Sequence, residues 1–308
     1  MKKLIAGLLA SSLFFAPTAL AQEEEAPYAP NVQELGSGVF MLEGNGGNIG
    51  ILAGADGVFV IDSQFLDIAG QNIAAIAEVA GNAPTVLLNT HWHGDHTGGN
   101  AAFGGTIIAH DNVRGRLTSD QEITRFGRTS TTPAADKAAW PMISFADGLS
   151  LYLNGQTIDV FHTPTAHTDG DSMVYFREAN ILHMGDVFFR GNYPFIDTGS
   201  GGTVDGYIAA MQTAHDTIND ETQVIPGHGP VSSRADIAAS IDMLTGVRNA
   251  VATAIESGMN MDEAVKEDIL AEWNDAWGNG FIRPEAMIAL AWGDLEPKLA
   301  VATQGRGS

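Results

Sequence analysis

Short apolar runs separated by glycine-rich turns divide the chain into two similar series of elements. Apolar runs bounded by turn residues predict strands, whereas apolar residues at intervals of three and four predict helices. In the first series, strands are predicted at 39–43, 48–53, 58–61 and 84–89, and a helix at 68–79.

The second series repeats this order and leads into a helical end. It predicts strands at 157–161, 172–176, 180–183 and 222–225, and helices at 204–217, 234–256, 261–273 and 283–299. The stretch 118–142 between the two series predicts a surface excursion or lid. Two series of strands, each followed by helices, predict an α/β protein whose two sheets pack face to face with helices outside.

The amino-terminal residues have the layout of a secretory signal peptide. Two lysines precede the apolar stretch 4–15, and Ala19-Leu20-Ala21 has the small-x-small form of a cleavage site. The stretch is shorter than the roughly 20 residues that a membrane span needs. We therefore expect residues 1–21 to be removed on export to a periplasm, and residues 22–308 to form a single domain with a helical carboxy-terminal segment.

Composition and charge narrow the classes of function. The 308 residues are 44% hydrophobic and 17% charged, which is typical of a globular protein with a large core. The formal net charge of −22 disfavours nucleic acid and anionic membrane surfaces as partners, because both require a basic face. The chain contains no cysteine, so any metal ion must be bound by nitrogen and oxygen. A small-molecule substrate is the expected partner.

The candidate chemistry is concentrated directly after the last strand of the first series. There the sequence THWHGDHTGGN places four metal-competent side chains within six residues. If this segment begins extended, His91 and His93 project to the same side and can share one ion. Gly94 permits a sharp turn, so that Asp95 and His96 can address a second ion. Imidazoles suit zinc, and the carboxylate suits a pair of ions bridged by oxygen.

Signatures of other catalytic classes are missing from the sequence. It has no G-x-S-x-G elbow of a serine hydrolase and no P-loop. The glycine cluster Gly44–Asn48 has Ile49 where a dinucleotide fingerprint needs its third glycine, so this cluster predicts a tight hairpin turn.

The histidine-rich segment resembles the His-x-His-x-Asp-His signature of the metallo-β-lactamase superfamily. The resemblance extends to four further motifs, one before this segment and three after it. They occur in the family's order, and each lies at the end of a predicted strand. These are Asp62 in VFVIDS, His167 in TPTAHTDGDS, Asp186 in ILHMGD and His228 in VIPGHGP. The resemblance covers nearly the whole chain after residue 21 and implies the family's four-layer αββα sandwich.

The resemblance also implies a centre with two metal ions. The ligands of the first ion would be His91, His93 and His167, those of the second Asp95, His96 and His228, and Asp186 would bridge both. Two zinc ions are the expected cofactors, with iron or manganese as alternatives. Asp62 would hold the ligand loop from behind. The remaining histidines, His110, His162, His183 and His215, are predicted to be structural, with His162 and His183 as alternative supports of a ligand.

Such a centre performs hydrolysis without a protein nucleophile. Two ions about 3.5–4 Å apart can share a hydroxide that is deprotonated near neutral pH. That hydroxide would attack a carbonyl polarised by the first ion, while the second ion stabilises the leaving group. Asp95 is the predicted catalytic residue, because it can orient the hydroxide or relay a proton.

The segment around Asp186 bears on the substrate. The run AHTDGDSMVYF followed by ILHMGDVFF resembles β-lactam-hydrolysing members that carry a cysteine ligand, but this chain has Asp186 there and adds His96. These differences look like the thioesterase, lactonase and general hydrolase branches. Phe189 stands where that subclass has a substrate-binding lysine, and the next residue, Arg190, is a candidate for binding a substrate carboxylate.

We therefore expect a periplasmic zinc hydrolase with weak or promiscuous β-lactamase activity. Hydrolysis of another ester, lactone, thioester or sulfate ester is the alternative. A diiron redox protein is less favoured, because relatives of that kind carry glutamate in place of His93 and append a flavin domain. Substrate contacts are expected from 118–142 or 188–195.

Overall fold

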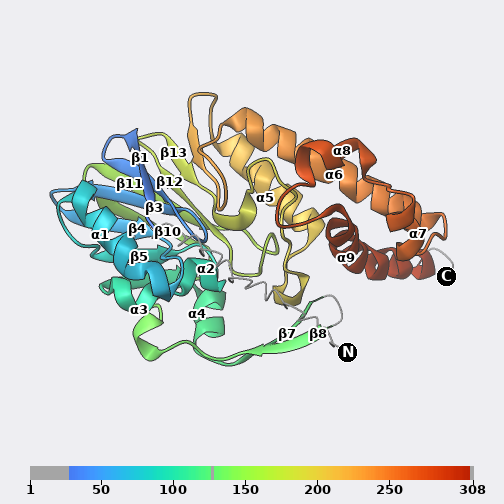
Figure 1. Ribbon diagram of the computed structural model, residues 1–308, viewed down its shortest axis with the longest axis horizontal. Helices are drawn as coiled ribbons and strands as arrows, with labels where there is room; N and C mark the ends of the chain where they lie inside the picture. Colours follow the sequence, from blue (N-terminus) through green and yellow to red (C-terminus); the bar gives the residue numbers. More distant parts are fainter. Residues whose placement is uncertain (1–27, 126–127, 306–308) are drawn as a thin grey trace, which may run out of the picture.

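The computed structural model describes residues 28–125 and 128–305, and it consists of four layers (Figure 1). A seven-stranded sheet packs against a five-stranded sheet, and helices cover the outer face of each. The predicted αββα sandwich is confirmed. The single domain expected over 22–308 stays a prediction, and the predicted signal peptide at 1–21 lies outside the described residues.

The first sheet joins an antiparallel meander to a parallel half. Its strands, in spatial order, are β1 (Asn31–Gly36), β2 (Val39–Glu43), β3 (Ile49–Gly54), β4 (Gly57–Ile61), β5 (Val86–Asn89), β6 (Thr106–His110) and β9 (Ile143–Phe145). Because β4 and β5 are parallel, their carboxyl ends lie at the same edge of the sheet.

The second sheet is antiparallel except at its last pair. Its strands, in spatial order, are β10 (Gly148–Leu153), β11 (Gln156–His162), β12 (Ser172–Phe176), β13 (Ile181–His183) and β14 (Gln223–Ile225). The parallel pair β13 and β14 brings two further carboxyl ends to one edge.

A hydrophobic core between the two sheets holds the sandwich together. Phe59 of the first sheet meets Phe176 of the second edge to face, with ring centroids 6.2 Å apart. Strand β11 alternates buried and partly buried residues, as expected for a strand with one face in the core. Strand β3 is buried on both faces over residues 49–52, because α1 (Ala69–Ala80) covers its outer side.

Helices of the second half form a larger outer layer around the second sheet. Helix α5 (Val204–Thr217) packs against α6 (Arg234–Glu256), which packs against α9 (Pro284–Gly305). A reciprocal capping box begins α6, in which Ser233 and Asp236 bond each other's backbone amides. Among the described helices, none combines the length and apolar composition required to cross a bilayer.

The structure differs from the sequence prediction at three places. The helix predicted over 261–273 is wrong: it is two helices, α7 (Met261–Lys266) and α8 (Ala271–Trp277), separated where Asp268 adopts a positive φ of 50°. Strands β1, β6, β9 and β10 and helix α4 (Asp111–Leu117) were not predicted. The excursion at 118–142 contains a hairpin of β7 (Gln121–Arg125) and β8 (Arg128–Thr132), and β8 is exposed throughout.

Candidate metal centre

Seven ligand candidates from both halves meet where strands of the two sheets end. His91 and His93 follow β5, and Asp95 and His96 lie in the short helix α2 (Gly94–Thr97) that comes next. The chain bends at residues 90–92, where the sequence analysis assumed an extended start, and it is extended at His93 before turning at Gly94 into α2. The other three come from the second half: His167 lies between β11 and β12, Asp186 in the 3₁₀ turn η3 (Gly185–Val187) after β13, and His228 after β14.

The first ligand group consists of His91, His93, His167 and Asp186. One ligand atom from each lies within 4.8 Å of the others. His93 Nδ1 is 2.9 Å from His167 Nε2, and Asp186 Oδ2 lies 3.8 Å from His91 Nε2 and 3.5 Å from His167 Nε2. Three imidazoles and one carboxylate oxygen therefore surround a common point.

The second ligand group consists of Asp95, His96 and His228, whose ligand atoms also lie within 4.8 Å of one another. Asp95 Oδ2 is 3.3 Å from His228 Nε2 and 3.6 Å from His96 Nε2. The other oxygen of Asp186, Oδ1, lies 3.0 Å from His96 Nε2 and 3.5 Å from His228 Nε2. Asp186 thus presents one oxygen to each group, which is the position of a bridging ligand.

Orphaned polar atoms in this cluster fit a bound cation. Among the described residues, His91 Nε2, His96 Nε2 and Asp186 Oδ1 are buried and have no hydrogen-bond partner. Buried polar atoms in folded proteins are almost always satisfied, so three orphans facing one another call for a missing partner. Imidazole nitrogen and carboxylate oxygen are ligands of divalent ions such as zinc. The cluster therefore indicates a divalent metal site.

Protonation in the first group favours metal binding. Burial lowers the pKa of His91 well below its ordinary value, and burial also lowers the pKa of His93 and of His167. These imidazoles are accordingly neutral near pH 7, and a neutral imidazole has the lone pair that a metal requires.

The second group carries paired charges instead. Burial lowers the pKa of His228, but the carboxylates of Asp186 and Asp95 outweigh it and raise the value to about 9. Burial raises the pKa of Asp95, but His96 and His228 outweigh it and lower the value to about 2. The carboxylates thus draw positive charge to this end of the cluster, which a metal ion can supply in place of protons.

A layer of buried partners orients the ligand imidazoles. Asp62, which follows β4, accepts hydrogen bonds from the Thr90 amide (2.8 Å) and hydroxyl (2.7 Å), and its Oδ2 lies 2.7 Å from His96 Nδ1. His167 Nδ1 donates to the Phe195 carbonyl over 2.7 Å. Such contacts fix the ring that faces the metal. The supporting role that the resemblance implied for Asp62 agrees with this geometry.

Asp197 has a matching role that the sequence did not reveal. Its Oδ2 lies 2.8 Å from His93 Nε2, on the side of the ring away from His167, and it also accepts a hydrogen bond from Ser200. Asp197 lies 104 positions from His93 in the sequence and in no motif, so only the fold shows the pair.

The glycine-rich turn 44–48 also belongs to the site. It connects β2 to β3, as predicted, and Gly47 lies against His96: a Cβ at Gly47 would come 2.0 Å from His96 Cε1. Asn48 donates from Nδ2 to the carbonyls of Pro226 and Gly229, on either side of the ligand His228. The turn therefore packs on one ligand and anchors the loop of another.

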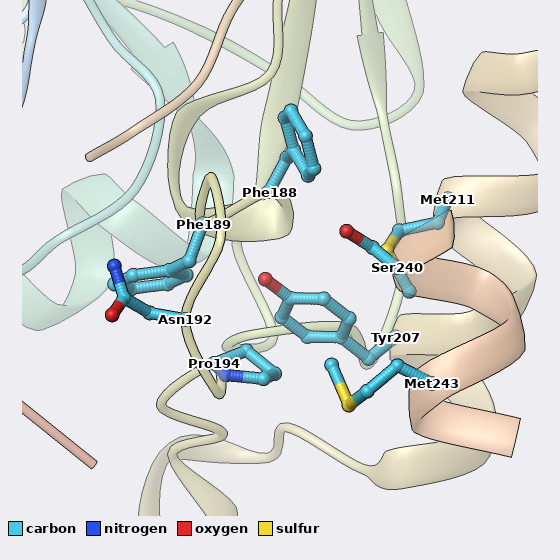
Figure 2. A pocket seen from close by; sticks show the side chains of 8 residues that line it. All are labelled: Phe188, Phe189, Asn192, Pro194, Tyr207, Met211, Ser240 and Met243. Atoms are coloured by element: carbon cyan, nitrogen blue, oxygen red, sulfur yellow. The ribbon is translucent and has the colours of Figure 1, made fainter. Parts of the chain in front are cut away.

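Tyr207 of α5 contacts the backbone of Asp186. Its hydroxyl donates to the Asp186 carbonyl over 2.7 Å. Figure 2 shows Tyr207 among the mostly apolar side chains that line a small void. The void has a volume of about 10 Å³, which leaves room for one water molecule at most. The backbone of the bridging residue is thereby tied to the helical layer.

A cavity of about 600 Å³ opens over both ligand groups. Ligand residues of both groups form its base. The lining consists of Phe65, His93, Gly94, Asp95, Asp186, Phe189, Asn192, Tyr193, Phe195, His228, Phe281 and Ile282. A volume of this size is typical of a small-molecule site.

Arg190, the candidate for binding a substrate carboxylate, pairs with another residue of the protein and does not line the cavity. Its Nη2 is 3.0 Å from Asp236 Oδ1 of α6, and Arg190 is not among the lining residues. Its role in substrate binding stays a prediction. Phe189 and Phe195, within the predicted contact segment 188–195, do line the cavity.

The four histidines predicted to be structural lie outside both ligand groups. His110 and His162 stack with ring centroids 3.7 Å apart. His183 accepts from the Gly185 amide and lies 3.3 Å from the Asn48 carbonyl, and His215 pairs with Asp216 at the end of α5.

Comparison with known proteins supports this interpretation. A family model described as the metallo-beta-lactamase superfamily matches residues 42–228. Acyl-coenzyme A thioesterase MBLAC2 of Gallus gallus is 28% identical over 63% of this chain and 78% of its own length. Hydroxyacylglutathione hydrolase of Polaromonas sp. is 26% identical over 70% of this chain and 74% of its own length.

Solved structures share the fold at low sequence identity. A metallo-beta-lactamase from Pontibacter korlensis superposes with a TM-score of 0.57 at 17% identity, over 70% of this chain and 99% of that one. The sec-alkylsulfatase Pisa1 from Pseudomonas sp. superposes with a TM-score of 0.65 at 15% identity, over 85% of this chain and 50% of that one. With the family match over most of the chain and the histidine–aspartate cluster in place, the chain belongs to the metallo-beta-lactamase superfamily, as one of its metal-dependent hydrolases.

Proposed function

We propose that this chain is a dinuclear zinc hydrolase of ester-type carbonyl substrates, thioesters included, with β-lactam opening as a secondary activity. The observation that carries the proposal is the placement of Asp186, which presents one carboxylate oxygen to each of two ligand groups. Five imidazoles and two carboxylates form a donor set that suits zinc.

The protein's own residues divide the work of hydrolysis. Bound ions would lower the pKa of a water molecule and polarise a carbonyl. Asp95 lies at the base of the cavity, where its carboxylate can orient the attacking water and accept its proton. Phe189 and Phe195 stack on His228 and His93, so the phenyl rings hold two ligand imidazoles beside the reacting bond.

The curated relatives favour ester and thioester substrates over β-lactams. One is named an acyl-coenzyme A thioesterase and another a hydroxyacylglutathione hydrolase, whereas the likeness to a metallo-beta-lactamase is one of fold. A second observation weakens the β-lactam assignment, since Arg190, the candidate partner for a substrate carboxylate, pairs with Asp236.

The test combines metal analysis with a panel of substrates. We expect two zinc ions per chain after reconstitution, and hydrolysis that a chelator abolishes and added zinc restores. Hydrolysis is expected to be faster on open-chain esters and thioesters than on a lactone, a sulfate ester or a chromogenic cephalosporin. Asp95→Ala is expected to lose at least about 10²-fold in kcat/KM. Asp242→Ala, at an exposed position of α6, is the matched control.

Two outcomes would contradict the proposal. Equal rates for Asp95→Ala and the unaltered protein on every substrate would refute the role of Asp95 in hydrolysis. Bound iron with a redox signal and no hydrolysis would favour the diiron alternative.

We also propose that the protein is exported to a periplasm and cleaved after Ala21. The charged and apolar pattern of residues 1–21 supports this. Mass spectrometry of the protein from a periplasmic extract is expected to show a mature amino terminus at Gln22, and full-length protein confined to the cytoplasmic fraction would refute it.

A further inference from the structure

The cavity above the ligand groups has aromatic walls beside both of them. The Phe195 ring stacks on the ligand His93, with centroids 5.9 Å apart and planes at 29°. The Phe189 ring stacks on the ligand His228, with centroids 5.0 Å apart and planes at 14°. A substrate whose reacting bond lies between the two ligand groups therefore meets phenyl surfaces on both sides.

A segment outside the family match completes the wall. Phe281 and Ile282 lie between α8 and α9, beyond the residues 42–228 that the family model covers. Ile282 is buried, whereas the Phe281 side chain is 87% exposed, although both line the cavity. Together with Phe65, Phe189 and Phe195, these two residues make the lining largely apolar.

Specific hydrogen bonds hold this segment against the cavity. The Tyr193 amide donates to the Trp277 carbonyl, and the Tyr193 hydroxyl donates to Asn274 Oδ1, each over 2.9 Å. Both acceptors belong to α8, so the helical end is tied to the loop that carries the other aromatic residues. The wall is thereby a defined part of the fold.

Away from the ligand residues, the described lining has no cationic side chain to pair with an anionic group. Among the described lining residues there is no lysine or arginine, and the charged groups belong to the ligand residues at the base. An anion placed against the phenyl rings would lose its hydration without a compensating partner, which is unfavourable. An uncharged apolar group would instead gain from leaving water.

We propose that this cavity selects substrates with an uncharged apolar acyl group, and that Phe281 and Ile282 determine this preference. The assignment of the acyl group to a cleaved substrate rests on the proposed function, whereas its binding does not. Each methylene buried in the cavity is expected to strengthen binding about fourfold, which corresponds to about 0.8 kcal/mol.

The experiment measures binding without turnover. Unreactive N-methylalkanamides of four to ten carbons are titrated into the zinc-loaded full chain, and tryptophan fluorescence gives Kd. We expect Kd to fall about fourfold per methylene until the cavity is filled. A probe of equal length whose alkyl chain ends in a hydroxyl group, which would be buried against the phenyl rings, is expected to bind about tenfold more weakly.

Variants localise the effect to the segment between α8 and α9. Phe281→Ala is expected to reduce the gain to less than about twofold per methylene for the longer amides and to leave the shortest amide unchanged, while Phe281→Leu restores most of the gain. Because Phe281 is so exposed, its truncation spares the core. Tyr152→Ala is the matched control, since Tyr152 is 77% exposed on β10 and does not line this cavity.

A parallel series of p-nitrophenyl esters separates this inference from the proposed function. Amides that bind with the expected length dependence, with no ester hydrolysed, would refute the proposed ester hydrolysis and support the selection of apolar groups. The selection of apolar groups would be overturned by Kd values that do not change with length, by equal binding of the hydroxyl-ended probe, or by equal behaviour of Phe281→Ala and the unaltered protein.

Discussion

The two ligand groups share Asp186 but differ in how deeply the fold encloses them. In the first group, the side chains of His91 and His167 are 1% and 0% exposed. In the second group, Asp95 and His228 are 27% and 32% exposed. The first group is thus the more deeply buried, although its His93 is 13% exposed at the cavity, whereas in the second group only His96 is fully buried.

The difference shows how one cluster can bind a metal ion tightly at one end and stay accessible from the cavity at the other. Burial leaves the imidazoles of the first group neutral, and the Phe195 carbonyl and Asp197 fix two of them before any ion binds. In the second group, paired charges neutralise one another at the edge of the cavity. We therefore expect the first group to hold its ion more tightly and the second to exchange it.

The largest expected effect follows from removing the carboxylate that both groups share. Asp186→Ala removes the carboxylate that presents one oxygen to each group, so neither group keeps its full ligand set. We expect metal content below one ion per chain and a fall in kcat/KM of at least about 10³-fold. Two ions retained in this variant, measured by elemental analysis, would refute the bridging position.

Single ligands from each group distinguish the deep from the shallow site. His228→Ala is expected to keep about one ion per chain and measurable activity, because the first group stays intact. His167→Ala removes a buried ligand and is expected to lower both metal content and activity further. Zinc titration against a competing chelator measures both affinities. Equal losses of zinc affinity in the two variants would show that the burial of a ligand group does not determine how tightly it binds its ion.

The glycine turn gives a test on backbone packing. Gly47→Ala would bring a methyl group into the His96 ring, which must then shift away from the second ion. We expect kcat/KM to fall about 10²-fold, the effect of misplacing a group by about 1 Å, with the first ion retained. Gly70→Ala is the control: nothing lies within 4 Å of its Cβ in helix α1, so it is expected to stabilise by about 0.5–1 kcal/mol.

Asp62 connects the two groups from behind, because it contacts Thr90, next to His91, and also His96. Asp62→Asn replaces an acceptor oxygen with a donor in a fully buried network. We expect a loss of about 1–3 kcal/mol in unfolding free energy and a 10–100-fold loss in zinc affinity. Urea denaturation with and without zinc measures both. An unchanged zinc affinity would mean that Asp62 supports the fold alone.

The smallest expected effect is that of Tyr207→Phe. This variant deletes the hydroxyl that donates to the Asp186 carbonyl and keeps the ring in its apolar surroundings. We expect a loss of about 0.5–1.5 kcal/mol in unfolding free energy, with two ions still bound. A loss of metal in this variant would show that the second layer of contacts matters as much as the ligands.

Much of this protein was determined by local sequence. The alternation of apolar runs and turns predicted most strands, because strand periodicity is a property of neighbouring residues. The His-x-His-x-Asp-His segment brought four ligand candidates together, because the turn at Gly94 leads the chain back so that the rings of His91 and His96 lie 4.2 Å apart. The helix predicted over 261–273 failed where Asp268 breaks the pattern through its backbone conformation, which hydrophobic spacing does not encode.

Only the tertiary structure decided which distant residues support the ligands and which line the cavity. The pairing of Asp197 with His93, the packing of Gly47 on His96 and the engagement of Arg190 by Asp236 all join segments far apart in the chain. The position of Phe281 in the lining of the same cavity as the ligands also depends on segments far apart in the chain. These contacts depend on how two sheets and a helical end pack together, and packing is decided by the shape and burial of whole surfaces rather than by any single stretch of sequence.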